Sequence, residues 1–426
     1  MLDTLIKLLK DAGVYAWELT DEKTRGWEFY FIRHALDQNR AKNVEHLYVK
    51  VYQLAEDGSS IGSASAELAP TASEAEAKAL IESLAYRATL VKNMPYTLVG
   101  PTPVETAAQE PVDVAAIAAK FLETMRCLPE TEGEDINSYE IFVSEKTTRF
   151  VNSNGVDLQE TYPSSLSEVV VTARRDGHEI ELYRSYDSGS CDAEALRRDL
   201  VRTMQYGKDR LRAEPTPALG KADVLFSAAD ACEIYEFFAA RVNAQMVFRK
   251  ISPWQIGVPI AEDIRGDKVT VSAVRSLPNS SKNHLFDAQG APIRDTVMVR
   301  DSVPACFLGD RMFSCYLGLE NSFMPTNVSV EPGTHSEEEL RRGAYLEVVE
   351  FSDFQVDYMT GDVFGEIRLA YWHDGDTVTP VSGGSVTGTM ADFAKTMRMS
   401  RELRQYDCWL IPAVTRLSGV TVTGAV

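Results

Sequence analysis

The sequence has no apolar run long enough to cross a membrane, and its start is not typical of a secreted protein. The first residues, MLDTLIKLLKDAG, place Leu2, Leu5 and Leu9 among charged residues, which is the pattern of an amphipathic helix. A basic leader, a continuous apolar block and a small-residue cleavage site are all missing from this segment. We therefore expect a cytoplasmic protein that has no membrane partner.

Paired cysteines and an excess of basic charge are also absent. The six cysteines form no Cys-x-x-Cys pair, and the length of 426 residues is not typical of a disulfide framework. The formal net charge is −20, whereas nucleic-acid binding needs clustered Lys and Arg to neutralise phosphates. The charge therefore argues against nucleic acid as the main partner.

Motifs of several catalytic classes are missing as well. No Gly-x-Ser-x-Gly elbow occurs. The segment GGSVTGT, residues 383–389, has Thr389 where a phosphate loop needs Lys. The only His-Glu pair, His178-Glu179, lies on a predicted strand and has no second histidine nearby. This arrangement does not fit the helix of a zinc protease.

The length of the chain indicates two domains. Two prolines and a glycine interrupt the periodic elements over residues 212–223, which is the best domain boundary. Before this boundary, hairpin turns are predicted at Asn154-Gly155 and Asp176-Gly177. The Pro- and Ala-rich stretch at residues 100–113 indicates an exposed linker.

Strand patterns dominate after the boundary. A capping box at Ser336 begins one predicted helix, and residues 389–407 are predicted to form another. Segregated helices and mostly antiparallel strands predict the α+β class. The expected domains are an N-terminal helix-and-sheet domain over residues 1–214 and a β-rich, mostly antiparallel domain over residues 220–426.

The segment at residues 223–250, DVLFSAADACEIYEFFAARVNAQMVFRK, predicts a strand followed by a helix. Apolar residues cover much of the helix circumference over residues 237–242, so we expect the helix to be buried. The helix offers two carboxylates, Glu233 and Glu236, but no histidine.

Several features occur in a distinctive order along the chain. They are Asn154-Gly155 in a strand turn, the strand and helix at 223–250, Asn327 with EPGTHSEEEL, VDYMTGD, TPVSGGSVTG, and a cysteine before a closing strand. In this order the chain resembles the TldD/TldE (PmbA) family, also labelled modulators of DNA gyrase, over about residues 138–426. The resemblance implies an N-terminal α/β-type domain and a β-rich C-terminal domain.

TldD-type members of that family resemble zinc metalloproteases. They carry His-Glu-x-x-x-His on the helix after the strand and a further cysteine ligand near the C-terminus, with the Glu as general base. In this sequence the first histidine position falls on Tyr235 or Glu236. The second histidine position falls on Ala240 or Arg241, and the cysteine corresponds to Cys408. None of the four helix residues can rebuild a histidine pair.

The resemblance therefore implies a chain with no catalytic residue, no cofactor site and no metal site of its own. Its implied role is the non-catalytic TldE/PmbA-like subunit of a zinc metalloprotease that degrades unstructured peptides or processes peptide precursors. Zinc is expected in a TldD-like partner, bound in a heterodimer, although a homodimer stays open.

An extended peptide could pair with a strand edge, and the glycine turns and the strand Val363–Tyr371 are candidate positions. Two alternative functions stay open. One is a self-sufficient peptidase that uses an atypical metal, a glutamate-plus-cysteine site or Cys408. The other is a regulatory binding protein without protease activity.

Overall fold

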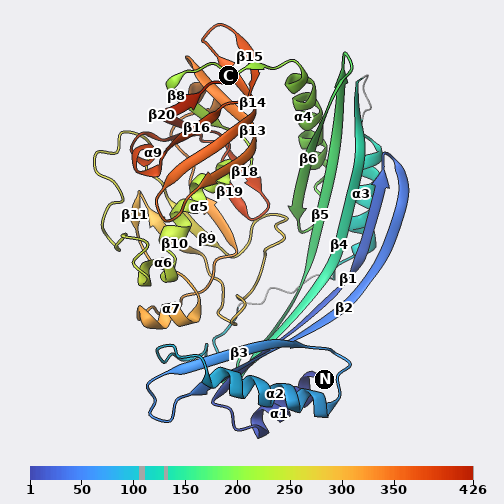
Figure 1. Cartoon of the computed structure of the whole chain (residues 1–426), viewed down its shortest axis with the longest axis vertical. Coiled ribbons are helices and arrows are strands. Elements are labelled where there is room, and N and C mark those ends of the chain that lie inside the picture. Colours follow the sequence, from blue (N-terminus) through green and yellow to red (C-terminus); the bar gives the residue numbers. More distant parts are fainter. Residues whose placement is uncertain (105–110, 129–132, 426) are drawn as a thin grey trace.

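The structure is a computed structural model that describes residues 1–104, 111–128 and 133–425. Two sheet-rich halves make up the molecule (Figure 1). One half is built on a single long sheet, and the other contains a ring of strands and a second sheet. The mixture of helices and mostly antiparallel strands confirms the predicted α+β class.

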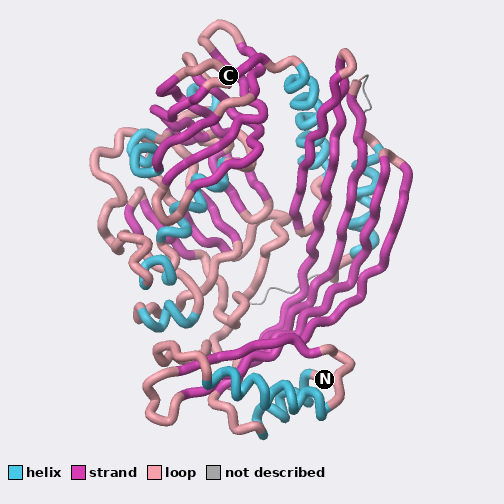
Figure 2. Tube along the Cα trace, in the orientation of Figure 1, coloured by secondary structure: helices cyan, strands magenta, loops and turns pink. Residues whose placement is uncertain are grey.

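Very long antiparallel strands form the first sheet (Figure 2), in the order β3-β2-β1-β4-β5-β6. These strands are β1 (Ala16–Ile32), β2 (Ala35–Leu54), β3 (Ile61–Leu68), β4 (Glu134–Asn152), β5 (Asp157–Arg175) and β6 (His178–Ser188). Asp176 and Gly177 have φ values of 51° and 80°, as a two-residue hairpin turn requires. The two predicted turns, Asn154-Gly155 and Asp176-Gly177, therefore do connect neighbouring strands.

Helices cover both ends of this sheet. They are α1 (Leu2–Asp11), α2 (Glu74–Thr89), α3 (Val114–Arg126) and α4 (Ala193–Leu211). Leu5 of α1 and Ile81 of α2 are buried in one apolar cluster, and Phe121 of α3 and Leu200 of α4 are buried in another. The linker predicted at residues 100–113 lies partly outside the described residues, because these exclude 105–110.

Five strands of the C-terminal half pair in a closed ring. These strands are β8 (Gly220–Phe226), β13 (Tyr345–Val356), β14 (Asp362–His373), β16 (Ser385–Thr389) and β20 (Thr415–Thr423). The strand β8 pairs with β13 and β20, β20 pairs with β16, β16 pairs with β14, and β14 pairs back to β13. Short strands extend the ring, namely β7 (Glu214–Pro215), β15 (Val378–Ser382) and β17 (Arg398–Met399).

A second sheet packs beside the ring. Its strands, in sheet order, are β11 (Val303–Pro304), β10 (Thr296–Arg300), β9 (Val271–Val274), β12 (Asn327–Val330), β19 (Trp409–Pro412) and β18 (Leu403–Tyr406). The helices of this half are α5 (Ala231–Arg241), α6 (Ala244–Phe248), α7 (Arg311–Tyr316), α8 (Glu337–Leu340) and α9 (Met390–Thr396). Helix α5 contacts β13 of the ring and β9, β10 and β19 of the second sheet, so it lies between the two.

The helix predicted over residues 389–407 is wrong for most of its length. Only Met390–Thr396 is helical. The following residues form strands instead: Arg398–Met399 pairs with β20, which begins 16 residues later, and Leu403–Tyr406 forms a tight hairpin with β19. This pairing buries Met399, and such tertiary contacts override local helix propensity. The capping box at Ser336 is confirmed at the start of α8.

Candidate functional site

Helix α5 begins directly after β8, as the sequence predicts. Val224, Leu225 and Phe226 at the end of β8 are all buried. Four residues later the chain enters α5, and no residue of this helix is exposed. Ile234, Phe237 and Phe238 fix the deeply buried side of the helix in the main core. The prediction of a buried helix is confirmed.

Two of the positions predicted to be degenerate zinc ligands are core residues. Tyr235 is completely buried, and its hydroxyl lies 2.6 Å from the Thr415 hydroxyl. Arg241 is also buried, and its guanidinium donates to the Met359 carbonyl at 2.8 Å and lies over the Phe237 ring. Both side chains therefore stabilise the surroundings of α5.

The other two predicted positions, Glu236 and Ala240, lie on a half-buried stripe of α5. Cys232 and Glu233 border this stripe, since positions i, i+1, i+4 and i+8 of a helix lie within an arc of about 100°. The Tyr358 hydroxyl donates to Glu233 Oε2 at 3.1 Å. Burial raises the pKa of Glu233, and the neighbouring Glu236 raises it further. The structure thus divides the four predicted positions between two sides of the helix.

Cys408 lies in the tight turn between β18 and β19. The preceding residue, Asp407, has a φ of 44° and accepts hydrogen bonds from the Ser281 N–H and hydroxyl, both at 2.7 Å. Burial raises the pKa of the Cys408 thiol to about 11, and the Asp407 carboxylate contributes. Cys408 is therefore mainly a neutral thiol at neutral pH.

Cys232 belongs to α5, the helix that contacts β19, and β19 begins directly after Cys408. Burial, and secondly Cys408, raise the pKa of Cys232. Our sequence reasoning missed this residue. The signal was present, because Cys232 and Glu236 have the i, i+4 spacing that places two ligands on one side of a helix.

Solved structures with the same fold cover the whole chain. TldE from Thermococcus kodakarensis has a TM-score of 0.80 at 14% identity, over 99% of this chain and 100% of that chain. A candidate modulator of a DNA gyrase from Thermotoga maritima has a TM-score of 0.78 at 16% identity, over 100% and 99%. Another, from Bacteroides thetaiotaomicron, has a TM-score of 0.79 at 15% identity, over 99% and 98%.

A comparison with curated protein sequences gave no match. Residues 219–424 match the family model of the PmbA/TldA metallopeptidase C-terminal domain. This match and the shared fold support the TldD/PmbA family for this chain. The matched residues include β8, α5 and the Cys408 turn, so the site described above lies within the family's C-terminal domain.

The residues around α5 do not fit the zinc ion that similarity to the TldD/PmbA family suggests. All histidines of the chain lie outside α5, at His34, His46, His178, His284, His335 and His373. In the part of the chain that the structure describes, no group of three or more His, Cys, Asp or Glu residues could hold a metal ion. Zinc binds thiolates and imidazoles, whereas burial raises the pKa of both nearby thiols.

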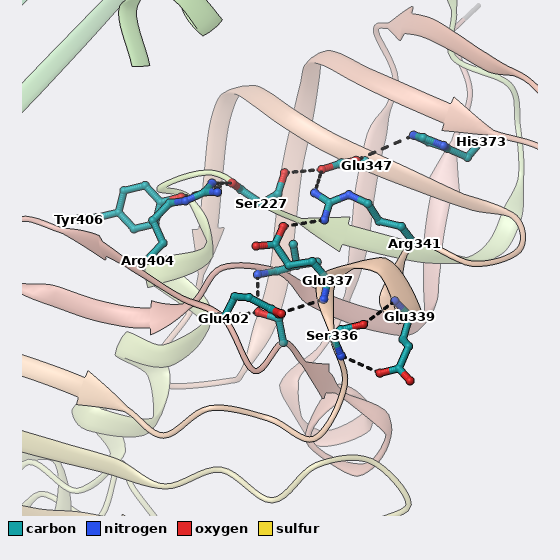
Figure 3. Close-up of polar contacts among 12 residues, drawn as sticks. Ser227, Ser336, Glu337, Glu339, Arg341, Glu347, His373, Glu402, Arg404 and Tyr406 are labelled. Atoms are coloured by element: carbon teal, nitrogen blue, oxygen red, sulfur yellow. Dashed lines mark hydrogen bonds and ion pairs between the residues drawn. The ribbon is translucent and has the colours of Figure 1, made fainter. Parts of the chain in front are cut away.

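A polar network holds the turn from which α5 starts (Figure 3). The Ser227 carbonyl accepts hydrogen bonds from Arg404 at 3.0 Å and from the Tyr406 hydroxyl at 3.3 Å. The Ser227 hydroxyl donates to Glu347 at 2.6 Å, and Arg341 pairs with Glu347 at 2.7 Å. Since Arg404 and Tyr406 belong to β18, the strand that leads into Cys408 also holds the start of the helix that carries Cys232.

The alkylation rate of Cys408 is expected to rise about tenfold per pH unit from pH 7 to pH 10, because only the thiolate reacts. Its pKa of about 11 means that the thiolate fraction is still increasing over this range. A free thiol with a pKa of about 8.5 would instead level off. Mass spectrometry after timed treatment with iodoacetamide measures the alkylation rate of Cys408 at each pH. A plateau for Cys408 below pH 9 would contradict the prediction.

Proposed function

We propose that this chain is the non-catalytic, TldE-like subunit of a TldD/TldE-type zinc metallopeptidase. The observation that carries the proposal is helix α5, which has the expected position in the fold but offers thiol and carboxylate groups instead of imidazoles. Without imidazoles at this position, the reaction centre belongs to a TldD-like partner. This chain contributes part of the wall that surrounds an unstructured peptide in the cytoplasm.

The peptide does not pair with the strand Val363–Tyr371, as the sequence suggested. This strand lies within β14, whose neighbours are β13 on one side and β15 and β16 on the other. The Gly383-Gly384 turn is also used, because it exchanges backbone hydrogen bonds with Ile367 of β14. The binding position predicted at Val363–Tyr371 is therefore wrong, because the backbone groups of this strand already pair with neighbouring strands.

Two outer strands lie near Cys408 and are better candidates. The strand β18 ends the second sheet and leads into the Cys408 turn. The strand β6 ends the long sheet, and its Asp187 influences the pKa of Cys408. We infer that an extended peptide adds to one of these edges through backbone hydrogen bonds, which do not depend on its sequence.

The test is co-purification with a His-Glu-x-x-x-His paralogue, followed by metal analysis and peptide cleavage for each chain alone and for the pair. This chain alone is expected to hold no stoichiometric zinc and to cleave nothing. The pair is expected to cleave an unstructured peptide faster than the paralogue alone. Zinc in the purified single chain, lost together with peptide cleavage on chelation, would refute the proposal.

A second candidate is a self-sufficient thiol peptidase, which the proximity of Cys232 and Cys408 favours. The raised pKa of both thiols makes them weak nucleophiles at neutral pH. Peptide cleavage by the isolated chain that is abolished by Cys408→Ser would support this candidate. Partner binding without any change in cleavage would indicate a regulatory binding protein.

A further inference from the structure

A short polar segment, residues 278–284, bridges the two halves of the molecule beside Cys408. Its sequence is PNSSKNH, which contains no large apolar side chain. The residues that flank it are different, because Leu277 and Phe286 are buried. This segment, which we call the polar strap, is therefore held by polar contacts, whereas the chain after it is held in the apolar core.

On one side, the polar strap is bonded to the N-terminal half. The Asn279 amide oxygen accepts from the Ser190 N–H and hydroxyl, both at 2.7 Å, and its NH₂ group donates to the Ser190 carbonyl at 2.6 Å. The His284 Nδ1 lies 2.7 Å from Glu160 of β5. Glu160 is buried and has a second partner in the Leu285 N–H.

On its other side, the polar strap is bonded to the C-terminal half around Cys408. Ser281 donates both its N–H and its hydroxyl to Asp407, the residue before Cys408. The Gln405 side chain of β18 donates to the Pro278 carbonyl at 2.6 Å. The strap thus contacts, at one time, the N-terminal half and the turn that carries Cys408.

The two kinds of attachment differ in how easily they open. Hydrogen bonds of the strap can be exchanged for hydrogen bonds to water, so their net contribution is small. The neighbouring apolar contact cannot be replaced in this way: Phe150 is buried in the core of the C-terminal half, directly against the backbone at Gly290. Segments with few buried apolar contacts open locally at low free energy while the rest of the fold stays intact.

We propose that the polar strap is a gate, which opens locally between the two halves and uncovers Cys408 and the start of α5. In the open state the contacts of Asn279 and Ser281 are replaced by contacts to water, and residues 285–293 stay in place. The opening is a property of this chain alone. We expect an extended peptide to pass the gate, and only this part of the proposal rests on the proposed function.

The test uses the variant Asn279→Gly in the full chain. Asn279 has a φ of 56°, and glycine adopts such a conformation readily, so the variant loses the three side-chain hydrogen bonds but not the backbone shape. Hydrogen exchange of residues 278–284 and the alkylation rate of Cys408 at fixed pH are measured. Lys282→Arg is the matched control, because this exposed side chain belongs to the same segment and arginine keeps the positive charge that lowers the pKa of Cys408.

Asn279→Gly is expected to raise both the exchange rate and the Cys408 alkylation rate at least about tenfold, and Lys282→Arg to leave them unchanged. Hydrogen exchange of buried Val49 and Val51 of β2, which are distant from the strap, reports global unfolding. Unchanged rates in Asn279→Gly would overturn the gate, and so would an equal rise in the exchange of Val49 and Val51. A strap that opens in a chain that never stimulates a TldD-like partner would instead refute the proposed function and leave the gate standing.

Discussion

The double variant Cys232→His/Glu236→His is expected to bind about one zinc ion per chain, whereas the natural chain is expected to bind none. The two positions are one helical turn apart on the half-buried stripe of α5, and Cys408 directly precedes β19, which contacts this helix. With the unchanged Glu233 between them, the segment would read His-Glu-x-x-His, the spacing that places two imidazoles on one side of a helix. Two imidazoles and one thiolate are a sufficient set of zinc ligands.

Zinc content after gel filtration, measured by plasma mass spectrometry, checks this prediction. The matched control is Glu236→His/Ala240→His, which has the same spacing one turn further along α5 and away from Cys232. It is expected to bind zinc at least about tenfold more weakly. Adding Cys408→Ser to the first variant is also expected to weaken binding. Equal zinc content in all three variants would show that Cys408 does not face this stripe.

The variant Phe150→Ala is expected to lower the free energy of unfolding by about 3–5 kcal/mol. Phe150 belongs to β4 of the N-terminal half, but its ring is buried in the core of the C-terminal half. A Cβ atom at Gly290 would lie only 2.6 Å from this ring, so the loop backbone packs directly against it. Loss of the ring leaves a cavity that rigid backbone on both sides cannot fill.

Chemical denaturation measures this loss, and Phe142→Ala is the control on the same strand. Phe142 is half-buried and packs edge-on against Tyr30 at 5.8 Å, so its removal is expected to cost less than about 1.5 kcal/mol. Phe150→Ala is also expected to separate unfolding into two transitions, because the two halves lose their shared core. A single unfolding transition, with an equal loss of unfolding free energy in both variants, would contradict this prediction.

Local sequence signals predicted the elements of the site well. The strand β8, the buried helix α5, the capping box at Ser336 and both hairpin turns were all predicted, because each depends on neighbouring residues. The arrangement of these elements could not be predicted in the same way. Cys232 and Cys408 are distant in the sequence, and only the packing of α5 against β19 brings the second thiol towards the helix.

The burial of Tyr235 and Arg241 shows a second limit of prediction from the sequence. A charged residue at the end of a helix is normally expected at the surface. Arg241 is instead buried, because the carbonyls of Ile251 and Met359 accept its hydrogen bonds and the Phe237 ring lies beneath it. These partners come from loops and from a residue one helical turn away, and their joint geometry has no signature in a single sequence.

The closed ring of strands has a consequence for biosynthesis. The strand β8 is made halfway along the chain, and its two neighbours, β13 and β20, are made more than a hundred residues later. A nascent chain that has not yet reached Thr415 therefore carries unsatisfied backbone edges on β8 and β16, and such edges attract other chains. The ring can close only when β20 has left the ribosome. Premature termination shortly before that point would thus yield an aggregating fragment rather than a smaller working domain.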